Sequence, residues 1–87
     1  MQSLIRALNG QTRVEILKIL MKGDDCVCHL AAKLKKDVST ISRHVELLKM
    51  ANLIETRREG KMLVCKIRDR EALCELFNAI RRLGGKI

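Results

Sequence analysis

The sequence predicts a mainly α-helical fold that carries one β-hairpin, with its elements in the order α-α-α-α-β-β-α. Two observations lead to this fold class. Apolar residues recur at helical spacing along most of the chain, and after Asn52 the period changes to that of strands. The chain has 87 residues, no proline and no linker-like stretch, which predicts a single domain over residues 1–87.

The first two helices are marked by the residues at their ends. Residues 2–8 read as a short helix that ends at Asn9-Gly10. Thr12-x-x-Glu15 has the form of a capping box, so it is expected to open a second, buried helix. Gly23 is expected to close that helix, because glycine readily takes the conformation that ends one.

The third and fourth helices are short and separated by a tight break. Asp24 and Asp25 are expected to cap the third helix, and Lys35-Lys36-Asp37 interrupts the pattern. Ser39 is expected to cap the fourth helix. The apolar residues that recur in it at helical spacing are Ile41, Val45 and Leu48.

The chain after Asn52 alternates as strands do and then returns to helical spacing. Two strand-like runs flank Arg58-Glu59-Gly60-Lys61, where Gly60 can take the positive φ of a tight turn. Asp69 is expected to cap a last helix, which Gly84-Gly85 ends. Its apolar stripe comprises Leu73, Leu76, Phe77, Ile80 and Leu83.

The composition favours a polyanionic partner. Eighteen Lys and Arg residues against ten Asp and Glu give a formal charge of +8, which favours nucleic acid, although a lysine-rich, heat-adapted surface would give the same excess. Phe77 is the sole aromatic residue, which counts against proteins that stack single-stranded bases. Apolar runs are too short to span a membrane, and the four scattered cysteines fit the reducing cytoplasm. A catalytic motif is also lacking, so an enzyme is not expected.

Two short helices followed by a hairpin describe a winged helix-turn-helix. The second helix of such a pair enters the major groove of double-stranded DNA with its N-terminal end first. The polar residues there are expected to contact DNA: Ser39, Thr40, Ser42, Arg43 and His44. The hairpin supplies Arg57, Arg58 and Lys61 for phosphates or the minor groove. Capping and a solvated hairpin are the alternative explanation of these residues.

Soft metal ligands stand at the head of this segment. Cys26, Cys28 and His29 are the candidate ligands, because thiolates favour soft or borderline ions such as Cd, Pb, Zn or As(III). In an ideal helix Cys26 and Cys28 point about 200° apart, whereas Cys26 and His29 share a face. Either the first turn distorts so that both thiols converge, or Cys26 and His29 form the pair. Half-buried cysteines with no metal role remain the other interpretation.

Four stretches resemble, in order, successive blocks of the ArsR/SmtB family of metal-sensing winged-helix repressors. They are ALNGQTRVEILKIL, DDCVCHLAAKL, STISRHVELLKMANLI and RREGKMLVCKI. The resemblance implies a homodimer formed through the first and last helices, an inverted-repeat operator, and repression until an inducer weakens DNA binding. It also places Cys-Val-Cys where the thiolate-type sensors of the family carry the same tripeptide.

The chain departs from the family's metal-binding patterns at several positions. Ala31 stands where many arsenic-type members have a third cysteine, and the start of the chain offers no cysteine of the cadmium type. His29 replaces the usual Asp, a ligand in some zinc-binding members. Residues 69–87 hold no histidine, so the zinc site of the last helix is not expected. Cys65 and Cys74 could be additional donors, but they are expected instead to be small buried hydrophobes.

The sequence thus predicts a repressor that releases its operator when a soft metal or metalloid binds cysteine thiolates. In a rival hypothesis the same fold senses thiol oxidation or persulfide, with Cys26 or Cys28 pairing with Cys74 or with a thiol of another subunit. A winged-helix module without an inducer is the third hypothesis. It predicts DNA binding that falls steeply with salt and shows little sequence preference.

Overall fold

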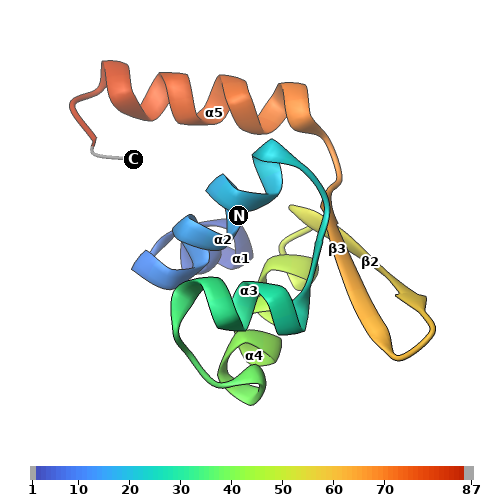
Figure 1. Ribbon diagram of the computed structural model, residues 1–87. Helices are drawn as coiled ribbons and strands as arrows, with labels where there is room; N and C mark the ends of the chain where they lie inside the picture. The colour runs from blue at the N-terminus through green and yellow to red at the C-terminus, as the bar shows by residue number, and fades with distance from the viewer. Residues whose placement is uncertain (1, 86–87) are drawn as a thin grey trace.

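The computed structural model describes residues 2–85 of the chain. Five helices and three strands follow one another: α1 Gln2–Leu8, α2 Gln11–Lys22, β1 Asp25–Cys26, α3 Val27–Leu34, α4 Val38–Met50, β2 Ile54–Glu59, β3 Met62–Ile67 and α5 Arg70–Arg82. Helices α1 to α4 form the body, the β2–β3 hairpin projects from one side of it, and α5 lies across the end opposite α4 (Figure 1). The predicted winged helix-turn-helix is confirmed.

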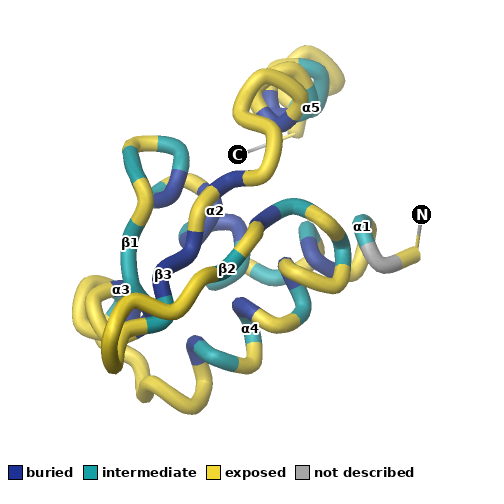
Figure 2. The backbone as a smooth tube through the Cα atoms, turned by 90° about the vertical axis from the view of Figure 1, so that its right-hand side faces the viewer, coloured by how far each residue is buried: buried dark blue, intermediate teal, exposed yellow. Residues whose placement is uncertain are grey.

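The core of the body is a single aliphatic cluster. Its members come from every helix and from both strands of the hairpin, and Figure 2 shows their backbone positions in dark blue. Fully buried side chains include Ile16, Leu17, Leu20, Leu30, Ile41, Leu48, Ile54 and Cys65. This shared core packs α3 and α4 of the helix-turn-helix against α2.

The sheet has one strand more than the sequence predicts. Strand β1 pairs antiparallel with β3, which also pairs with β2, so the strand order is β1-β3-β2. Asp25 lies opposite Cys65, and the hairpin register runs from Ile54 opposite Ile67 to Glu59 opposite Met62. Gly60 takes a φ of 61° in the turn, as predicted. The extra strand fastens the start of α3 to the hairpin.

Three of the predicted helix caps are wrong. Helix α2 begins at Gln11, so Thr12 lies inside it and forms no capping box with Glu15. The N-cap of α3 is Cys26 rather than Asp24 or Asp25, and the N-cap of α4 is Asp37 rather than Ser39. In each case the N-cap residue makes no side-chain hydrogen bond to the helix.

The predicted C-cap of α2 and the predicted N-cap of α5 are both confirmed. Gly23 follows α2 as its C-cap, and its N–H donates to the carbonyl of Leu20. The side chain of Asp69 accepts a hydrogen bond from the N–H of Ala72 at 3.0 Å and thereby caps α5.

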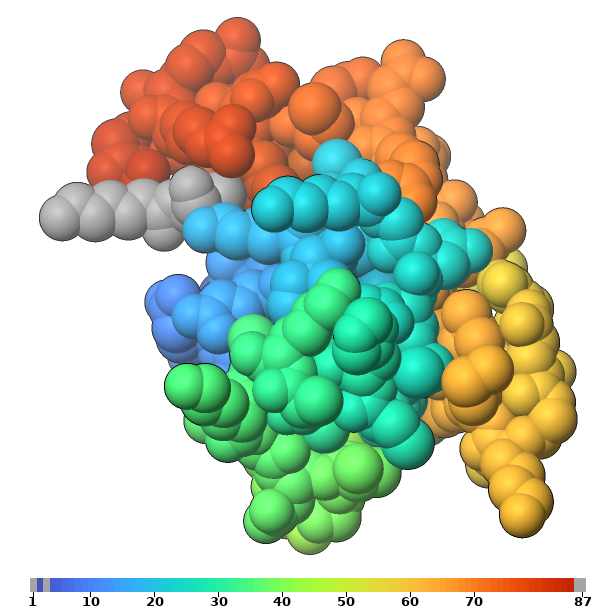
Figure 3. Space-filling model, in the orientation of Figure 1, coloured from blue at the N-terminus to red at the C-terminus, as the bar shows by residue number. Residues whose placement is uncertain are grey.

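Helix α5 is only partly covered by the body. Leu73 and Phe77 are buried, whereas Leu83 is 88% exposed, and Ile5 on α1 is 61% exposed. The helix forms a separate ridge in the space-filling view (Figure 3). Between it and α1 lies a hollow of about 180 Å³, lined by Leu4, Asn52, Leu53, Arg68, Asp69, Ala72, Leu73 and Leu76. Within residues 2–85, no helix combines the length and the apolar character needed to cross a bilayer.

Candidate nucleic-acid interface and thiol site

The turn between α3 and α4 sets the direction of the second helix. Lys35 ends α3 in the left-handed region at a φ of 55°, and its N–H and that of Lys36 donate to carbonyls of the last turn of α3. Such a left-handed residue is a common way to stop a helix sharply. Helix α4 can therefore begin at Val38 and cross α3 with its N-terminal end exposed.

Helix α4 separates its apolar and polar residues onto two faces. Ile41, Val45 and Leu48 are buried, which matches the predicted spacing. Ser39, Thr40 and Arg43 are exposed on the first two turns, and Ser42 is half-buried beside them. The structure thus brings four of the five predicted DNA-contacting residues of this helix to its accessible side.

The side chain of His44 points toward α2. Its Nδ1 lies 3.0 Å from Nη1 of Arg13, a residue of α2, and its side chain is half-buried. Burial lowers the pKa of His44 below its ordinary value of 6.5, and the nearby cations Arg13, Lys36 and Arg43 lower it further. The imidazole is therefore neutral at pH 7, and Nδ1 faces the protein rather than solvent.

The hairpin residues differ in their surroundings. Arg58 and Lys61 are exposed toward the tip of the wing, which projects from the body in Figure 3. Arg57 is held between two carboxylates: its Nε donates to Glu59 and its Nη1 lies 3.4 Å from Oδ2 of Asp24. These two contacts raise the pKa of Arg57, the hydrogen bond with Glu59 most. A phosphate would have to compete with both carboxylates for this guanidinium.

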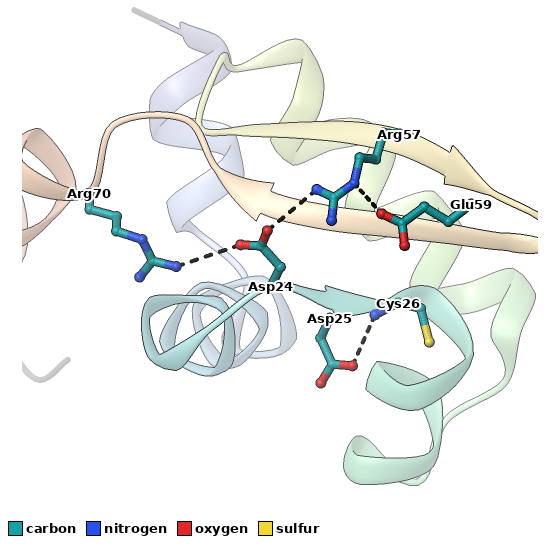
Figure 4. Close-up of polar contacts among 6 residues, drawn as sticks. All are labelled: Asp24, Asp25, Cys26, Arg57, Glu59 and Arg70. Atoms are coloured by element: carbon teal, nitrogen blue, oxygen red, sulfur yellow. Dashed lines mark hydrogen bonds and ion pairs between the residues drawn. The ribbon is translucent and has the colours of Figure 1, made fainter.

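Asp24 connects three parts of the fold, as Figure 4 shows. Besides Arg57 in the wing, it pairs with Arg70, the first residue of α5, at 3.6 Å. Arg70 in turn donates to the carbonyl of Met21 at 2.6 Å, near the end of α2. The side chains of Asp24, Arg57 and Arg70 are each more than one third exposed. Their ion pairs therefore orient these elements but add little stability.

The cysteine pair lies at the junction of β1 and α3. Cys26 is in extended conformation, with φ −94° and ψ 158°, and is half-buried, whereas Cys28 is exposed on the first turn of α3. Because Cys26 precedes the helix as its N-cap, the ideal helical spacing of Cys26, Cys28 and His29 does not describe this segment. The angle of about 200° between the two thiols therefore does not apply here.

Asp25 organises the residues around the cysteines. Its carboxylate accepts hydrogen bonds from the N–H of Cys26 at 2.9 Å, from Nδ1 of His29 at 2.7 Å and from Nζ of Lys33 at 2.9 Å. Burial raises the pKa of Asp25, but the bonds from Lys33, His29 and Cys26 outweigh this and hold the pKa below its ordinary value of 3.8. A metal-binding histidine commonly gives its second nitrogen to a carboxylate. The contact thus leaves Nε2 of His29 for a ligand.

The donors present fit an incomplete soft-metal site. The structure between residues 2 and 85 gathers no group of three or more His, Cys, Asp or Glu side chains in metal-binding geometry. Two thiols and one imidazole nitrogen lie within residues 26–29, fewer donors than the four of a structural zinc site. Their softness nevertheless suits thiophilic ions.

The remaining cysteines differ from each other. Cys65 is fully buried in the core, as predicted, and burial raises the pKa of its thiol to about 11, helped by Cys26 and Asp25. Cys74 is exposed on α5, so the prediction that it is buried is wrong. All four cysteines carry free thiols.

Comparison with known proteins decides the family. The family model described as "Bacterial regulatory protein, arsR family" matches residues 10–56, from the start of α2 into the first wing strand. The chain belongs to the ArsR family. The matched family and its relatives are regulatory proteins rather than enzymes, and the winged helix-turn-helix is the fold that this chain shares with them.

Curated relatives of this ArsR-family chain are regulators. It is 41% identical over 58 residues, 66% of its length and 65% of the relative's, to "Uncharacterized HTH-type transcriptional regulator MJ1325" of Methanocaldococcus jannaschii. It is 34% identical over 67 residues, 76% of its length, to the "Cadmium resistance transcriptional regulatory protein CadC homolog" of Staphylococcus aureus and spans 55% of that protein. The chain thus covers between half and two thirds of these relatives.

Solved structures agree on the fold. The crystal structure of a possible transcriptional regulatory protein from Mycobacterium bovis, fragment 1–100, has a TM-score of 0.87 at 28% identity, covering 95% of this chain and 88% of that one. A solution structure of a Mycobacterium bovis winged helix-turn-helix domain has a TM-score of 0.83 at 28% identity, covering 95% of this chain and 76% of that one. It is described as homodimeric and as a possible ArsR-family regulator.

Proposed function

We propose that this ArsR-family chain is a homodimeric repressor that binds an inverted-repeat operator and releases it when a soft metal or metalloid binds the thiolates of Cys26 and Cys28. The observation that carries the proposal is the position of the thiols. They lie at the junction of β1 and α3, two and four positions after Asp24, whose carboxylate contacts both the wing and α5.

The proposed DNA surface follows from exposure and charge. Ser39, Thr40, Ser42 and Arg43 of α4 would meet base edges and phosphates in the major groove. Arg58 and Lys61 of the wing would contact backbone phosphates, and Arg57 would join them on leaving Asp24. His44 faces Arg13 instead.

Dimerisation is supported by the apolar surfaces that the subunit leaves uncovered. Ile5 on α1 and Leu83, the C-cap residue of α5, are largely exposed, and the hollow between these helices is mostly apolar in its lining. A second copy would bury them and would set the spacing of the two reading helices on adjacent half-sites.

Release requires that the inducer bind better to a conformation that fits the operator less well. The inducer would be held by the thiolates of Cys26 and Cys28, with Nε2 of His29 as a third donor. Drawing these side chains together displaces the residues just before them, Asp24 and Asp25. Their contacts to Arg57, Arg70 and Lys33 would then change, which alters the wing, α5 and α3 together.

The names of two relatives support this choice of inducer. One is the cadmium-resistance regulator of Staphylococcus aureus, and another is the "Arsenical resistance operon repressor" of Escherichia coli K12, 37% identical over 59 residues, which are 67% of this chain and 50% of that protein.

A titration of the fully reduced protein with cadmium tests the proposal. Thiolate-to-metal absorption in the near ultraviolet should saturate in the wild type and disappear in Cys26→Ser and in Cys28→Ser. Cys74→Ser is the matched control and should keep it. The same cadmium should release a duplex that was selected from a random pool by the wild-type protein.

Each other result excludes a part of the proposal. Loss of absorption in Cys26→Ser alone would favour Cys26 with His29. If cadmium increases the affinity of the protein for the duplex, the proposed release is contradicted. Absence of absorption in the wild type would reject the metal site. A mass loss of two hydrogens per disulfide after mild oxidant, with altered DNA binding, would then favour thiol oxidation as the signal.

A further inference from the structure

One arginine side chain of α2 contacts two other helices. Arg13 lies in the first turn of α2, and its Nε donates to the carbonyl of Ala7 at 3.1 Å while Nη2 donates to the carbonyl of Arg6 at 2.9 Å. Both carbonyls belong to the C-terminal end of α1. The third nitrogen, Nη1, lies 3.0 Å from Nδ1 of His44 in α4. The guanidinium thus joins the end of α1 to the middle of the proposed reading helix.

The contact specifies the protonation state of His44. A guanidinium has donors only and stays charged at all ordinary pH values, so Nδ1 of His44 must accept and the ring proton must be on Nε2. The charged groups that face the ring are all cations: Arg13 from α2, Lys36 from the turn before α4, and Arg43 from α4 itself. A protonated His44 would lose the hydrogen bond and would face three like charges.

The guanidinium of Arg13 occupies space that a side chain at position 10 would fill, and Gly10 has none. A Cβ on this glycine would lie 2.7 Å from Nη2 and 2.8 Å from Cζ of Arg13. The backbone itself does not require glycine, because its φ of −124° and ψ of 129° are ordinary extended values. An alanine would therefore displace the arginine rather than strain the turn.

We infer that Arg13 and neutral His44 are positioning residues that hold the reading helix at a fixed place relative to α1, and that protonation of His44 releases this hold. The inference rests on the DNA binding of the proposed function. Since α1 belongs to the proposed dimer surface, the contact relates the reading helix to the partner subunit. It also assigns His44 a role other than DNA contact.

The two roles of His44 predict opposite effects of acid. If His44 touched a phosphate, protonation would add a favourable charge and strengthen DNA binding as the pH falls. If His44 accepts from Arg13, protonation removes the contact and weakens the fit to the selected duplex. The sign of the pH dependence therefore separates a DNA contact from a positioning residue.

The first experiment measures affinity for the selected duplex between pH 7.5 and 5.5, in the wild type and in His44→Asn. Asparagine keeps an acceptor oxygen close to the place of Nδ1 and does not ionise. Affinity of the wild type should fall about tenfold for each unit by which DNA binding lowers the pKa of His44, and that of His44→Asn should be nearly constant. An affinity that rises in acid, or the same profile in both proteins, would overturn the inference.

The second experiment needs no DNA. His29 is the other of the two histidines, so a His29→Gln background leaves a single imidazole signal whose pKa can be followed by NMR. Arg13→Met should raise the pKa of His44 toward 6.5, because a facing cation and its hydrogen bond are removed. An unchanged pKa would refute the contact.

Gly10→Ala supplies an independent check through a double-mutant cycle. It should lower the free energy of unfolding in the wild type and have much less effect in Arg13→Met, where no guanidinium needs the space. Equal effects in both backgrounds would contradict the inference. If no duplex binds any variant at pH 7.5, the proposed function fails, while the NMR measurement and this cycle still test the contact itself.

Discussion

Helices α4 and α5 have the same length, 13 residues each, but they are covered very differently. Helix α4 buries Ile41, Val45 and Leu48, a complete apolar stripe, against its own subunit. Helix α5 has an equally regular stripe, yet it buries only Leu73 and Phe77, and Leu83, the C-cap residue that continues the stripe, is 88% exposed.

The difference shows that a strong apolar stripe does not by itself say what a helix packs against. For α4 the partner surface is the core formed by α2, α3 and the sheet, and the opposite face of the helix is polar. For α5 the body covers only part of the stripe. The helix proposed to read DNA is thus fixed within the subunit, whereas the helix proposed to join subunits is not.

The largest expected effect is on the buried stripe of α4. Leu48→Ala should lower the free energy of unfolding by about 2–5 kcal/mol, the usual cost of a cavity at a fully buried leucine. Urea unfolding at one fixed protein concentration measures it, because dimerisation contributes to stability. Leu83→Ala, at the C-cap of α5, is the matched control and should cost far less in the monomer. Equal losses would remove the contrast between the helices.

The next effect concerns association rather than folding. Ile80→Asp places a charge on the half-covered stripe of α5 and should raise the dimer dissociation constant at least about tenfold, equivalent to about 1.4 kcal/mol. Sedimentation equilibrium measures this constant, and circular dichroism should show an unchanged fold. Met62→Asp, an exposed apolar residue of the wing, is the control and should leave association unchanged. A dimer unaffected by Ile80→Asp would place the subunit contact elsewhere.

A smaller effect on stability is expected from the N-cap residues of α5 and α4. The carboxylate of Asp69 bonds the N–H of Ala72, whereas Asp37 makes no such bond to α4. Asp69→Ala should therefore cost about 0.5–2 kcal/mol, and Asp37→Ala only the few tenths that come from a charge near the helix dipole. Both are compared by urea unfolding, and a greater loss in Asp37→Ala would reverse the expected order.

The smallest effect depends on pH and acts on α3, against which α4 packs. The pKa of Asp25 is lowered in the folded state, so its stabilising contribution is fully present above 3.8 and is lost as the pH falls through the lower folded value. Asp25→Asn should cost at most about 1 kcal/mol at pH 6, because the pairs reach solvent. The difference from wild type should shrink below pH 3.8. A difference that persists in strong acid would mean that shape, not charge, is responsible.

The features that could be predicted from the sequence are local ones. Gly60 in the hairpin turn, Gly23 after α2 and Asp69 before α5 each act on residues within a few positions, so a short pattern identifies them. The exposed polar side of α4 could be predicted for the same reason, since one period fixes which residues share a face.

The features that the sequence missed around the cysteines and His44 depend on residues from other elements. The strand β1 exists because Asp25 pairs with Cys65. With two residues it is too short to show an alternation of apolar and polar residues that would predict a strand. The carboxylate of Asp25 is engaged by His29 and Lys33 as well as by the N–H of Cys26. The contact of Arg13 with His44 joins residues 31 positions apart. Sequence patterns therefore located the site segments but could not assign each side chain its partner.

The buried thiol of Cys65 has a practical use. With a pKa of about 11, only about one molecule in ten thousand carries its thiolate at pH 7, so maleimide reagents should spare it. In a protein whose Cys26 and Cys28 are serines, Cys74 on α5 becomes the one readily labelled position. Donor and acceptor dyes attached there would report, by energy transfer, how far apart the two α5 helices lie when the protein holds DNA and when it does not.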